Sequence, residues 1–169
     1  MSLTFVLGGA RSGKTSYALT QAGNQPAQRR VMVATAEALD AEMADRIARH
    51  RAERGADWVT VEAPRDLVGA VGDLAAGDVA VVDCLTLWLT NVMLDGVEPG
   101  PAVAALADAM GASPAELFVI SNEVGQGIVP DNALARRFRD EAGWMHQAVA
   151  AAAERVVMVV AGLPVVLKG

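Results

Sequence analysis

Short apolar runs recur along the 169-residue chain, and stretches of helical composition separate most of them. The runs that suit buried strands lie at residues 3–7, 31–34, 79–83, 117–121 and 156–160, with a shorter alternating run at 58–61 and an apolar triplet at 165–167. Strands that alternate with helices predict an α/β fold with a mostly parallel β-sheet and helices on both of its faces. Ligands of such sheets bind beyond the carboxyl ends of the strands.

Helical patterns fill the intervals between the strands. Residues 14–22 have helical composition, and residues 40–54 suit a helix with Asp40 as N-cap and Gly55 just past its end. A long helix is predicted from about 132 to 155, with a buried stripe of Ala135, Phe138, Ala142, Met145, Val149 and Ala153. The stretch 94–101 is rich in Gly and Pro and is expected to be the least ordered. Because no internal repeat or linker interrupts the pattern, residues 1–169 are interpreted as one domain.

Composition narrows the class of protein. Hydrophobic residues make up 53% of the chain and aromatic residues only 4%, so small aliphatic side chains dominate, which suits parallel strands buried on both faces. The net charge of −6 argues against broad electrostatic binding to nucleic acid. A single cysteine, Cys84, excludes an internal disulfide and favours a reducing compartment. With no signal peptide and no apolar run long enough to span a bilayer, we expect a cytoplasmic protein.

The clearest motif follows the first predicted strand. Residues Gly8, Gly9, Ala10, Arg11, Ser12, Gly13, Lys14 and Thr15 fit the phosphate-loop pattern of Gly, four residues, then Gly-Lys-Ser/Thr. Glycines let backbone N–H groups converge on phosphate oxygens, and the following helix N-terminus favours negative charge. Lys14 would reach the outer phosphates, and the Thr15 hydroxyl would ligate Mg²⁺. The alternative is an ordinary glycine-rich turn, which the full pattern between strand and helix disfavours.

A second candidate is the acid that ends the run 79–83. In a phosphate-loop protein, Asp83 would help to hold Mg²⁺ near the nucleotide. Alternatively, Asp83 is the N-cap of a helix that starts with the next residues. The phosphate loop upstream favours the Mg²⁺ role.

The predicted helix at 40–54 carries a histidine between two arginines. Arg46 and Arg54 stand four residues on either side of His50, so the three side chains share a face. Two guanidinium groups would suit a triphosphate and would keep the imidazole neutral and nucleophilic. Alternatively, His50 packs at the border of an apolar stripe beside solvated arginines, and the stretch by itself favours this interpretation.

Residues 121–130 form a polar, glycine-containing loop after a predicted strand, either a site or a plain connection. On the long helix that follows, His146 is expected at the helix surface or in a subunit contact, and we assign it no chemistry.

Taken together, these residues resemble the bifunctional adenosylcobinamide kinase / adenosylcobinamide-phosphate guanylyltransferase family of cobalamin biosynthesis. The matching stretches are residues 8–15, 34–36, 40–43, Arg46 with Ile47, His50 with Arg51, 58–64, 83–91, 122–130, 137–140 and 161–164. The resemblance covers nearly the whole chain, although the family would have Asn where His146 stands.

The resemblance implies two reactions in one phosphate-loop NTPase-type domain. ATP or GTP phosphorylates the aminopropanol hydroxyl of adenosylcobinamide, and GTP then donates GMP to that phosphate, giving adenosylcobinamide-GDP and pyrophosphate. The family carries GMP on a histidine that falls on His50, and Lys14 is the other expected catalytic residue. Nucleotide contacts fall on the phosphate loop and on Ala34, Thr35, Ala36, Arg51, Ala52, Glu53, Arg54, Glu62 and Asp83. Members form a propeller-like trimer, so a homotrimer is implied.

Two other functions remain open from the sequence. One is a simpler phosphate-loop kinase or nucleotide hydrolase in which His50 is structural. The other is a nucleic-acid motor on the same core, which the negative charge and the lack of a basic stripe disfavour.

Overall fold

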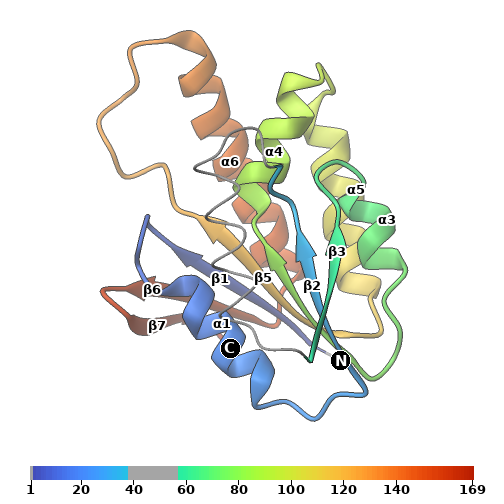
Figure 1. Ribbon diagram of the computed structural model, residues 1–169. Coiled ribbons are helices and arrows are strands. Elements are labelled where there is room, and N and C mark those ends of the chain that lie inside the picture. Colours follow the sequence, from blue (N-terminus) through green and yellow to red (C-terminus); the bar gives the residue numbers. More distant parts are fainter. Residues whose placement is uncertain (1, 38–56) are drawn as a thin grey trace.

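The computed structural model describes residues 2–37 and 57–169, and a seven-stranded sheet forms its centre (Figure 1). The strands are β1 (Leu3–Gly8), β2 (Arg29–Ala34), β3 (Trp58–Glu62), β4 (Asp78–Asp83), β5 (Glu116–Asn122), β6 (Arg155–Val160) and β7 (Leu163–Lys168). Their spatial order is β3-β2-β4-β5-β1-β6-β7. All neighbours run parallel except β6 and β7, which form an antiparallel hairpin. The predicted fold class is confirmed, including β3 as an edge strand.

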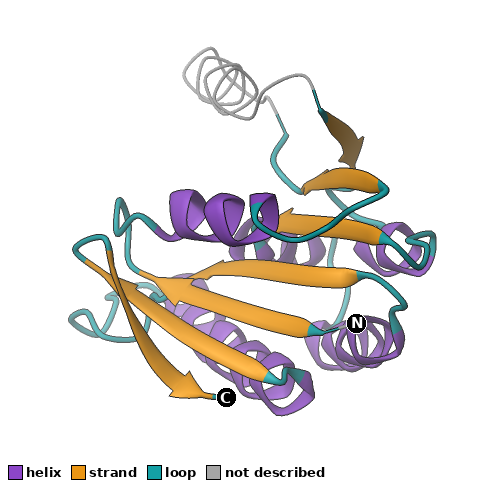
Figure 2. Ribbon diagram, turned by 90° about the horizontal axis from the view of Figure 1, so that it is seen from below, coloured by secondary structure: helices purple, strands orange, loops and turns teal. Residues whose placement is uncertain are grey.

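Helices cover both faces of this sheet (Figure 2). They are α1 (Lys14–Gly23), α3 (Leu67–Gly72), α4 (Leu85–Leu94), α5 (Pro99–Ala112) and α6 (Ala133–Ala152). Alternate strand residues pack into two hydrophobic clusters because successive side chains of a strand point to opposite faces. One cluster joins Phe5 and Val82 to buried residues of α3, α4, α5 and α6. The other joins Val6 and Val81 to Ala18 and Ala22 of α1.

Two expectations about helices need adjustment. The stretch 94–101 is not an irregular loop, because α4 ends at Leu94 and α5 already begins at Pro99. Proline suits the first turn of a helix, where no intrahelical partner is available for an N–H. The long helix is confirmed with slightly narrower bounds: Asn132 is its N-cap, and its side chain accepts a hydrogen bond from the Ala135 N–H. Along the described ranges, no helix combines the length and the apolar character that crossing a bilayer would require.

The amino edge of the sheet is closed by internal polar contacts. Arg29 Nε donates a hydrogen bond of 3.0 Å to Asp78 Oδ1, and the Ala75 N–H donates to Asp78 Oδ2 at 2.8 Å. The hydrogen bond from Arg29 is the main cause that lowers the pKa of buried Asp78. At the start of β1, the Leu3 N–H donates to Glu154 Oε2 at 2.6 Å. The carboxyl edge of the sheet differs from this edge, and the candidate site lies there.

Candidate active site

The glycine-rich motif forms a tight loop between β1 and α1. Gly13 is the N-cap of α1 and has φ of 93°, a left-handed conformation that glycine adopts without strain. A Cβ at Gly8 would lie 2.8 Å from the carbonyl oxygen of Val159 and 2.4 Å from Ser12 Oγ, so the neighbouring chain requires glycine here. A Cβ at Gly9 would meet nothing within 4 Å. Packing therefore explains Gly8, whereas the space beside Gly9 is available to a ligand.

A second chain segment supports the loop from the opposite end of the sequence. The Gly162 N–H, in the turn between β6 and β7, donates to the carbonyl oxygen of Ser12 at 2.8 Å. A Cβ placed on Gly13 would lie 3.2 Å from Gly162 Cα, so the two backbones are nearly in contact. The β6–β7 hairpin therefore helps to fix the shape of the loop.

Lys14, Thr15 and Asp83 come together at the carboxyl ends of β1 and β4. Lys14 is buried, with 8% of its surface exposed, and its Nζ donates to the Gly9 carbonyl oxygen at 3.0 Å. Thr15 Oγ1 donates to Asp83 Oδ2 at 3.2 Å. The N-cap of α4 is Cys84 rather than Asp83, so the capping alternative for Asp83 is wrong. The structure thus brings Asp83 next to the adjacent pair Lys14 and Thr15, although Asp83 follows Thr15 by 68 positions in the sequence.

The oxygen pair of Thr15 and Asp83 fits Mg²⁺ by its chemistry. Mg²⁺ prefers oxygen ligands and is commonly held by one or two protein oxygens, with phosphates and water completing the octahedron. In the described ranges, no group of three or more His, Cys, Asp or Glu side chains could hold a metal without such help. The residues present therefore suit a cation that arrives with a nucleotide.

The predicted contacts at the ends of β2 and β3 form a row beside Asp83. In the strand register, Ala34 faces Asp83 on one side and Glu62 on the other, so all three lie at the same height on the carboxyl edge. Thr35 is fully buried, and its hydroxyl donates to the Cys84 carbonyl oxygen at 2.7 Å and accepts from the Cys84 N–H at 2.8 Å. Its side chain therefore joins β2 to β4, and any contact of Thr35 with a nucleotide stays a prediction.

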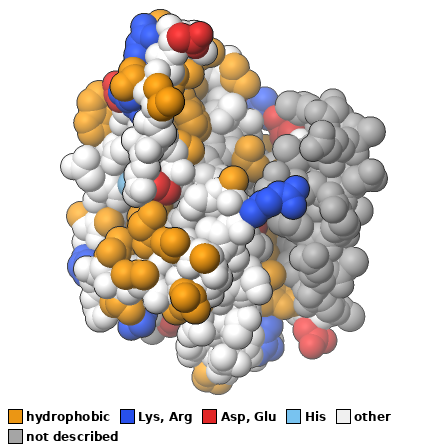
Figure 3. Space-filling model, turned by 90° about the vertical axis from the view of Figure 1, so that its left-hand side faces the viewer, with side chains coloured by type: hydrophobic (Ala, Val, Ile, Leu, Met, Phe, Trp, Pro, Cys, Tyr) orange, Lys and Arg blue, Asp and Glu red, His pale blue; other side chains and the backbone are white. Residues whose placement is uncertain are grey.

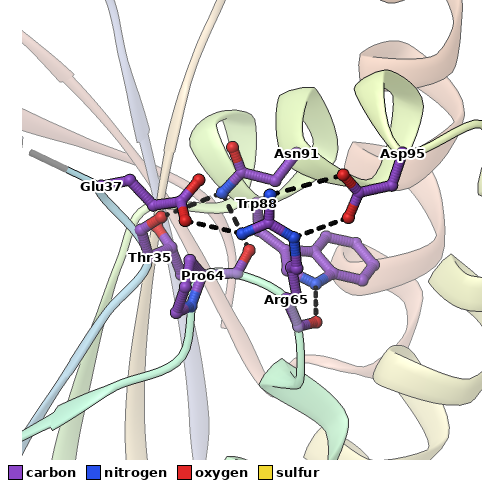
Figure 4. Close-up of polar contacts among 7 residues, drawn as sticks. All are labelled: Thr35, Glu37, Pro64, Arg65, Trp88, Asn91 and Asp95. Carbon is purple, nitrogen blue, oxygen red and sulfur yellow. Dashed lines mark hydrogen bonds and ion pairs between the residues drawn. The ribbon is translucent and has the colours of Figure 1, made fainter. Parts of the chain in front are cut away.

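A polar cluster that the sequence did not reveal anchors the chain after β2 (Figure 4). Arg65 donates to Glu37 and to Asp95, with 2.6 Å in each case. Asn91 of α4 donates to the carbonyl oxygens of Thr35 at 3.2 Å and of Pro64 at 2.8 Å. These contacts fasten residues 35–37 to α4. The sequence signal was that Thr35, Pro64 and Asn91 lie within stretches that resemble the family, which does not indicate that they contact one another.

The remaining predicted site residues lie outside the described residues. They are His50, Arg51, Ala52, Glu53 and Arg54, together with the flanking Arg46. Ala36 is described and lies within the anchored segment at residues 35–37. The expected sharing of one helix face by His50 and its two arginines therefore stays a prediction.

The end of β5 places a polar triplet next to the phosphate loop. Asn122 pairs with Gly8 in the register of β5 and β1, and the Glu123 N–H donates to the Gly8 carbonyl oxygen at 3.0 Å. Asn122 Nδ2 donates to Thr86 Oγ1 at 2.8 Å, which ties β5 to the start of α4. The loop at residues 121–130 therefore begins against the loop expected to bind phosphate, and its role in the site stays a prediction.

Of the two positions expected for His146, the helix surface is wrong, and a subunit contact stays a prediction. Its side chain is only 11% exposed, and its ring packs against Phe5 with the ring centroids 5.8 Å apart. Ser121 Oγ lies 2.8 Å from Nε2 of the ring. Burial lowers the pKa of His146, while Glu123 acts in the opposite direction. The helical period correctly placed Met145 and Val149 in the core but could not reveal that β5 offers polar partners to the residue beside them.

The geometry of the loop, with a buried lysine and a strand-end acid beside it, is typical of nucleotide-binding proteins of the phosphate-loop class. Solved structures agree on the fold. The chain superposes on an ATPase from the type III secretion system of pathogenic bacteria with a TM-score of 0.56 and 10% identity, covering 93% of this chain and 50% of that one. It superposes on a protein of Pyrococcus horikoshii OT3 with the same TM-score and identity, covering 99% and 86% of the two chains.

Residues 4–167 match the family described as cobinamide kinase / cobinamide phosphate guanyltransferase, and the chain belongs to that family. It is 47% identical over 167 residues to the bifunctional adenosylcobalamin biosynthesis protein CobP of Pseudomonas aeruginosa, covering 97% of this chain and 96% of the relative. It is 39% identical over 182 residues to the bifunctional adenosylcobalamin biosynthesis protein CobU of Salmonella typhimurium, covering 98% and 99%. The resemblance expected from the motifs is confirmed.

Proposed function

We propose that the chain catalyses two successive steps of cobalamin biosynthesis, as an adenosylcobinamide kinase and an adenosylcobinamide-phosphate guanylyltransferase. The observation that carries this proposal is the family match over residues 4–167, together with curated bifunctional relatives aligned along nearly their full length. The phosphate loop at the carboxyl edge of the sheet supplies the nucleotide site that both reactions need.

In the kinase step, the protein acts mainly by positioning groups and stabilising charge. The N–H groups of the loop and the N-terminus of α1 bind the phosphates, and Lys14 moves from the Gly9 carbonyl oxygen to the transferred group. Thr15 and Asp83 would hold Mg²⁺, which when bound neutralises charge on the phosphate oxygens. Either ATP or GTP fits this description, because the loop contacts only phosphates.

In the guanylyl step, we propose that His50 attacks the α-phosphate of GTP and carries GMP as a covalent intermediate. Its neutral imidazole would split one difficult displacement into two easier ones. The support is the resemblance of residues 40–54 and the position of His50 between two arginines. We further propose that Ala34, Thr35, Ala36, Glu62 and residues 51–54 surround the guanine nucleotide. A carboxylate such as that of Glu62 accepts hydrogen bonds from N–H groups, which guanine presents at N1 and at its 2-amino group.

The overall proposal is tested by incubating the protein with Mg²⁺, adenosylcobinamide and GTP and identifying the products by mass. We expect adenosylcobinamide phosphate first, then adenosylcobinamide-GDP with pyrophosphate. Phosphorylation of a nucleoside, with none of adenosylcobinamide, would contradict the proposal.

The histidine intermediate has its own test. GTP labelled at the α-phosphate should leave an acid-labile, base-stable label on the protein, whereas the γ-label should leave none at His50. The His50→Ala variant should lose the adduct and the guanylyl step but keep at least part of the kinase step. An adduct that persists in this variant, or that maps to His146 or a lysine, would contradict the assignment.

We also propose that the protein is a cytoplasmic homotrimer. The trimer follows from the resemblance, and the exposed apolar side chains of β7, namely Leu163, Val165, Val166 and Leu167, are available for a contact between copies. Figure 3 shows hydrophobic side chains gathered on the face of the molecule that carries β6 and β7. Sedimentation equilibrium should give three times the chain mass of 17.5 kDa, and a mass of one chain would contradict this proposal.

A further inference from the structure

A histidine bridges two polar residues at the point where β5 leaves the sheet. Ser121 Oγ lies 2.8 Å from His146 Nε2, and Glu123 Oε2 lies 3.9 Å from Nδ1 of the same ring. Ser121 has no exposed surface, and the ring is packed against Phe5. The serine, the imidazole and the carboxylate therefore form a row that runs from the interior to the carboxyl edge of the sheet.

The row has a preferred arrangement of protons. Burial lowers the pKa of His146, so the ring is neutral at pH 7 and carries one proton. A carboxylate can only accept, so Glu123 favours the proton on Nδ1, and Nε2 then accepts from the Ser121 hydroxyl. The Nδ1–Oε2 separation of 3.9 Å is longer than a hydrogen bond, so the ring acts on the carboxylate through the electrostatic attraction between its N–H and the negative charge.

The carboxylate of Glu123 is held beside the phosphate loop. Its own N–H donates to the Gly8 carbonyl oxygen at 3.0 Å, and its Oε1 accepts from the Gly125 N–H. The side chain remains 22% exposed, so it is accessible from solvent. Of the acids that the structure places at the carboxyl ends of strands, Asp83 contacts Thr15 and Glu62 lies on the edge strand β3. Glu123 is the one that directly follows β5, the strand that pairs with β1 and so lies beside the start of the loop.

We propose that Glu123 is the general base of phosphoryl transfer and that His146 is a positioning residue that orients its Oε2. The O–H bond of the acceptor breaks and its proton moves to Glu123. The oxygen forms a bond to the γ-phosphorus of the nucleoside triphosphate, and the bond from that phosphorus to the bridging oxygen breaks, leaving the electron pair on the diphosphate. The proton then passes to solvent. Capping of Gly125 uses only Oε1, so the loop contact does not compete with this role.

The two activities of the family make this inference testable inside one protein. A hydroxyl acceptor must lose a proton when it attacks phosphorus, whereas the acceptor of GMP is a phosphate that is already ionised. A general base is therefore needed in the kinase step and not in guanylyl transfer. A residue with a purely structural role would affect both.

The experiment compares Glu123→Gln with Glu98→Gln, which makes the same chemical change at a carboxylate that is 79% exposed. Single-turnover phosphorylation of adenosylcobinamide should fall by about 10²- to 10⁴-fold in Glu123→Gln. Guanylyl transfer to supplied adenosylcobinamide phosphate, followed by pyrophosphate release, should be little changed, as should GTP affinity by calorimetry. Unchanged phosphorylation, or an equal loss of both steps, would overturn the inference. If thermal melting shows that the Gln variant is unfolded, Glu123→Asp is used instead. Its shorter side chain keeps the charge but moves the carboxylate away from the acceptor, and the same selective loss of phosphorylation is expected.

The positioning role of His146 is tested by two substitutions. His146→Leu removes both ring nitrogens and should lower kcat for phosphorylation by about 10- to 100-fold, with little change in KM. His146→Asn keeps an N–H donor and should recover most of the rate. Equal rates in the two variants would overturn the positioning role.

The inference rests on the proposed kinase activity, but different results would contradict the two. A wild-type protein that phosphorylates no adenosylcobinamide contradicts the proposed function, whereas a Glu123→Gln variant with unchanged phosphorylation contradicts only the inference.

Discussion

Aspartate has different partners at the amino edge and at the carboxyl edge of the sheet. Strand β4 begins with Asp78 and ends with Asp83. Asp78 accepts hydrogen bonds from the guanidinium of Arg29 and from the Ala75 N–H, so its charge is balanced inside the protein. Asp83 accepts instead from the neutral hydroxyl of Thr15, at the end of the sheet where the phosphate loop lies. Aspartate at one edge stabilises the fold, and at the other it is placed to act on a ligand.

The difference follows from the direction of the strands. Parallel strands bring all their carboxyl ends to one edge, where the following loops diverge and leave room for a ligand. At the amino edge, the incoming chain segments supply partners such as Arg29 and Glu154. Substitutions at the two edges should therefore separate activity from stability.

The largest effect is expected from Lys14→Ala. This variant removes the cation that would stabilise the transferred phosphoryl group, so kcat/KM for phosphorylation should fall by about 10²- to 10³-fold. The matched control is Lys168→Ala, because Lys168 also donates to backbone carbonyl oxygens, those of Ala150 at 2.9 Å and Ala151 at 3.2 Å near the end of α6. The control should lose some thermal stability and keep GTP affinity. Lys14→Ala should also bind GTP much more weakly, and equal GTP affinity in wild type and variant, measured by calorimetry, would contradict the prediction.

The two aspartates of β4 should give opposite results. Asp83→Asn should fold normally and lose turnover by about 10- to 100-fold, with a higher Mg²⁺ requirement, because the metal loses a charged partner. Asp78→Asn should keep turnover in the folded fraction but lose about 1–3 kcal/mol of stability, since Arg29 loses its charged partner. Urea unfolding and Mg²⁺ titrations of activity measure the two effects. An unchanged Mg²⁺ dependence in Asp83→Asn would show that this acid has no metal role.

A smaller effect is expected from adding a methyl group to the phosphate loop. Gly9→Ala should leave stability nearly unchanged, because the new Cβ meets no protein atom within 4 Å, yet it should weaken GTP binding by occupying ligand space. Gly8→Ala should instead destabilise the fold by about 1–3 kcal/mol through its clash with the Val159 carbonyl oxygen. Thermal melting and calorimetry separate the two outcomes. Loss of stability in Gly9→Ala with unchanged GTP affinity would contradict the interpretation that the space beside Gly9 belongs to the ligand.

The smallest effect concerns acid. The pKa of Asp78 is lowered in the folded state, chiefly by the hydrogen bond from Arg29. The stabilisation from Asp78 is therefore complete above the ordinary pKa of an aspartate, about 3.9, and is lost as the pH falls through the lower folded-state value. Stability curves of wild type and Asp78→Asn should differ at neutral pH and converge in acid. A constant difference down to the lowest pH would contradict the ion pair as its source.

Much of the fold could be predicted because the core obeys local rules. Buried parallel strands produce apolar runs, so each strand was found near its observed bounds, and the helical pattern placed the long helix close to the bounds of α6. The order of the strands could not be predicted, because which runs become neighbours depends on long-range packing. Pro99 was misleading: a proline that starts a helix and one that interrupts a chain look alike in sequence.

The residues of the candidate site also differ in whether local sequence rules or long-range packing determine their positions. The phosphate loop is a contiguous motif with its own geometry, so its residues were found from sequence alone. Arg65, Asn91 and His146 act across elements, and no local pattern indicates that their partners are Asp95, Pro64 and Ser121. A helical period predicts which face of α6 is buried, but it does not predict which polar group of the neighbouring strand that face contacts.

The contact between Gly162 and the phosphate loop has a consequence for biosynthesis on the ribosome. The loop at residues 8–15 is translated long before its partner, because the N–H that binds the Ser12 carbonyl oxygen belongs to residue 162. Strand β1 likewise has neighbours that are made much later, β5 and β6. A nascent chain therefore carries its nucleotide-binding motif long before it can hold that motif in shape, and nucleotide binding should appear only after the β6–β7 turn has left the ribosome exit tunnel.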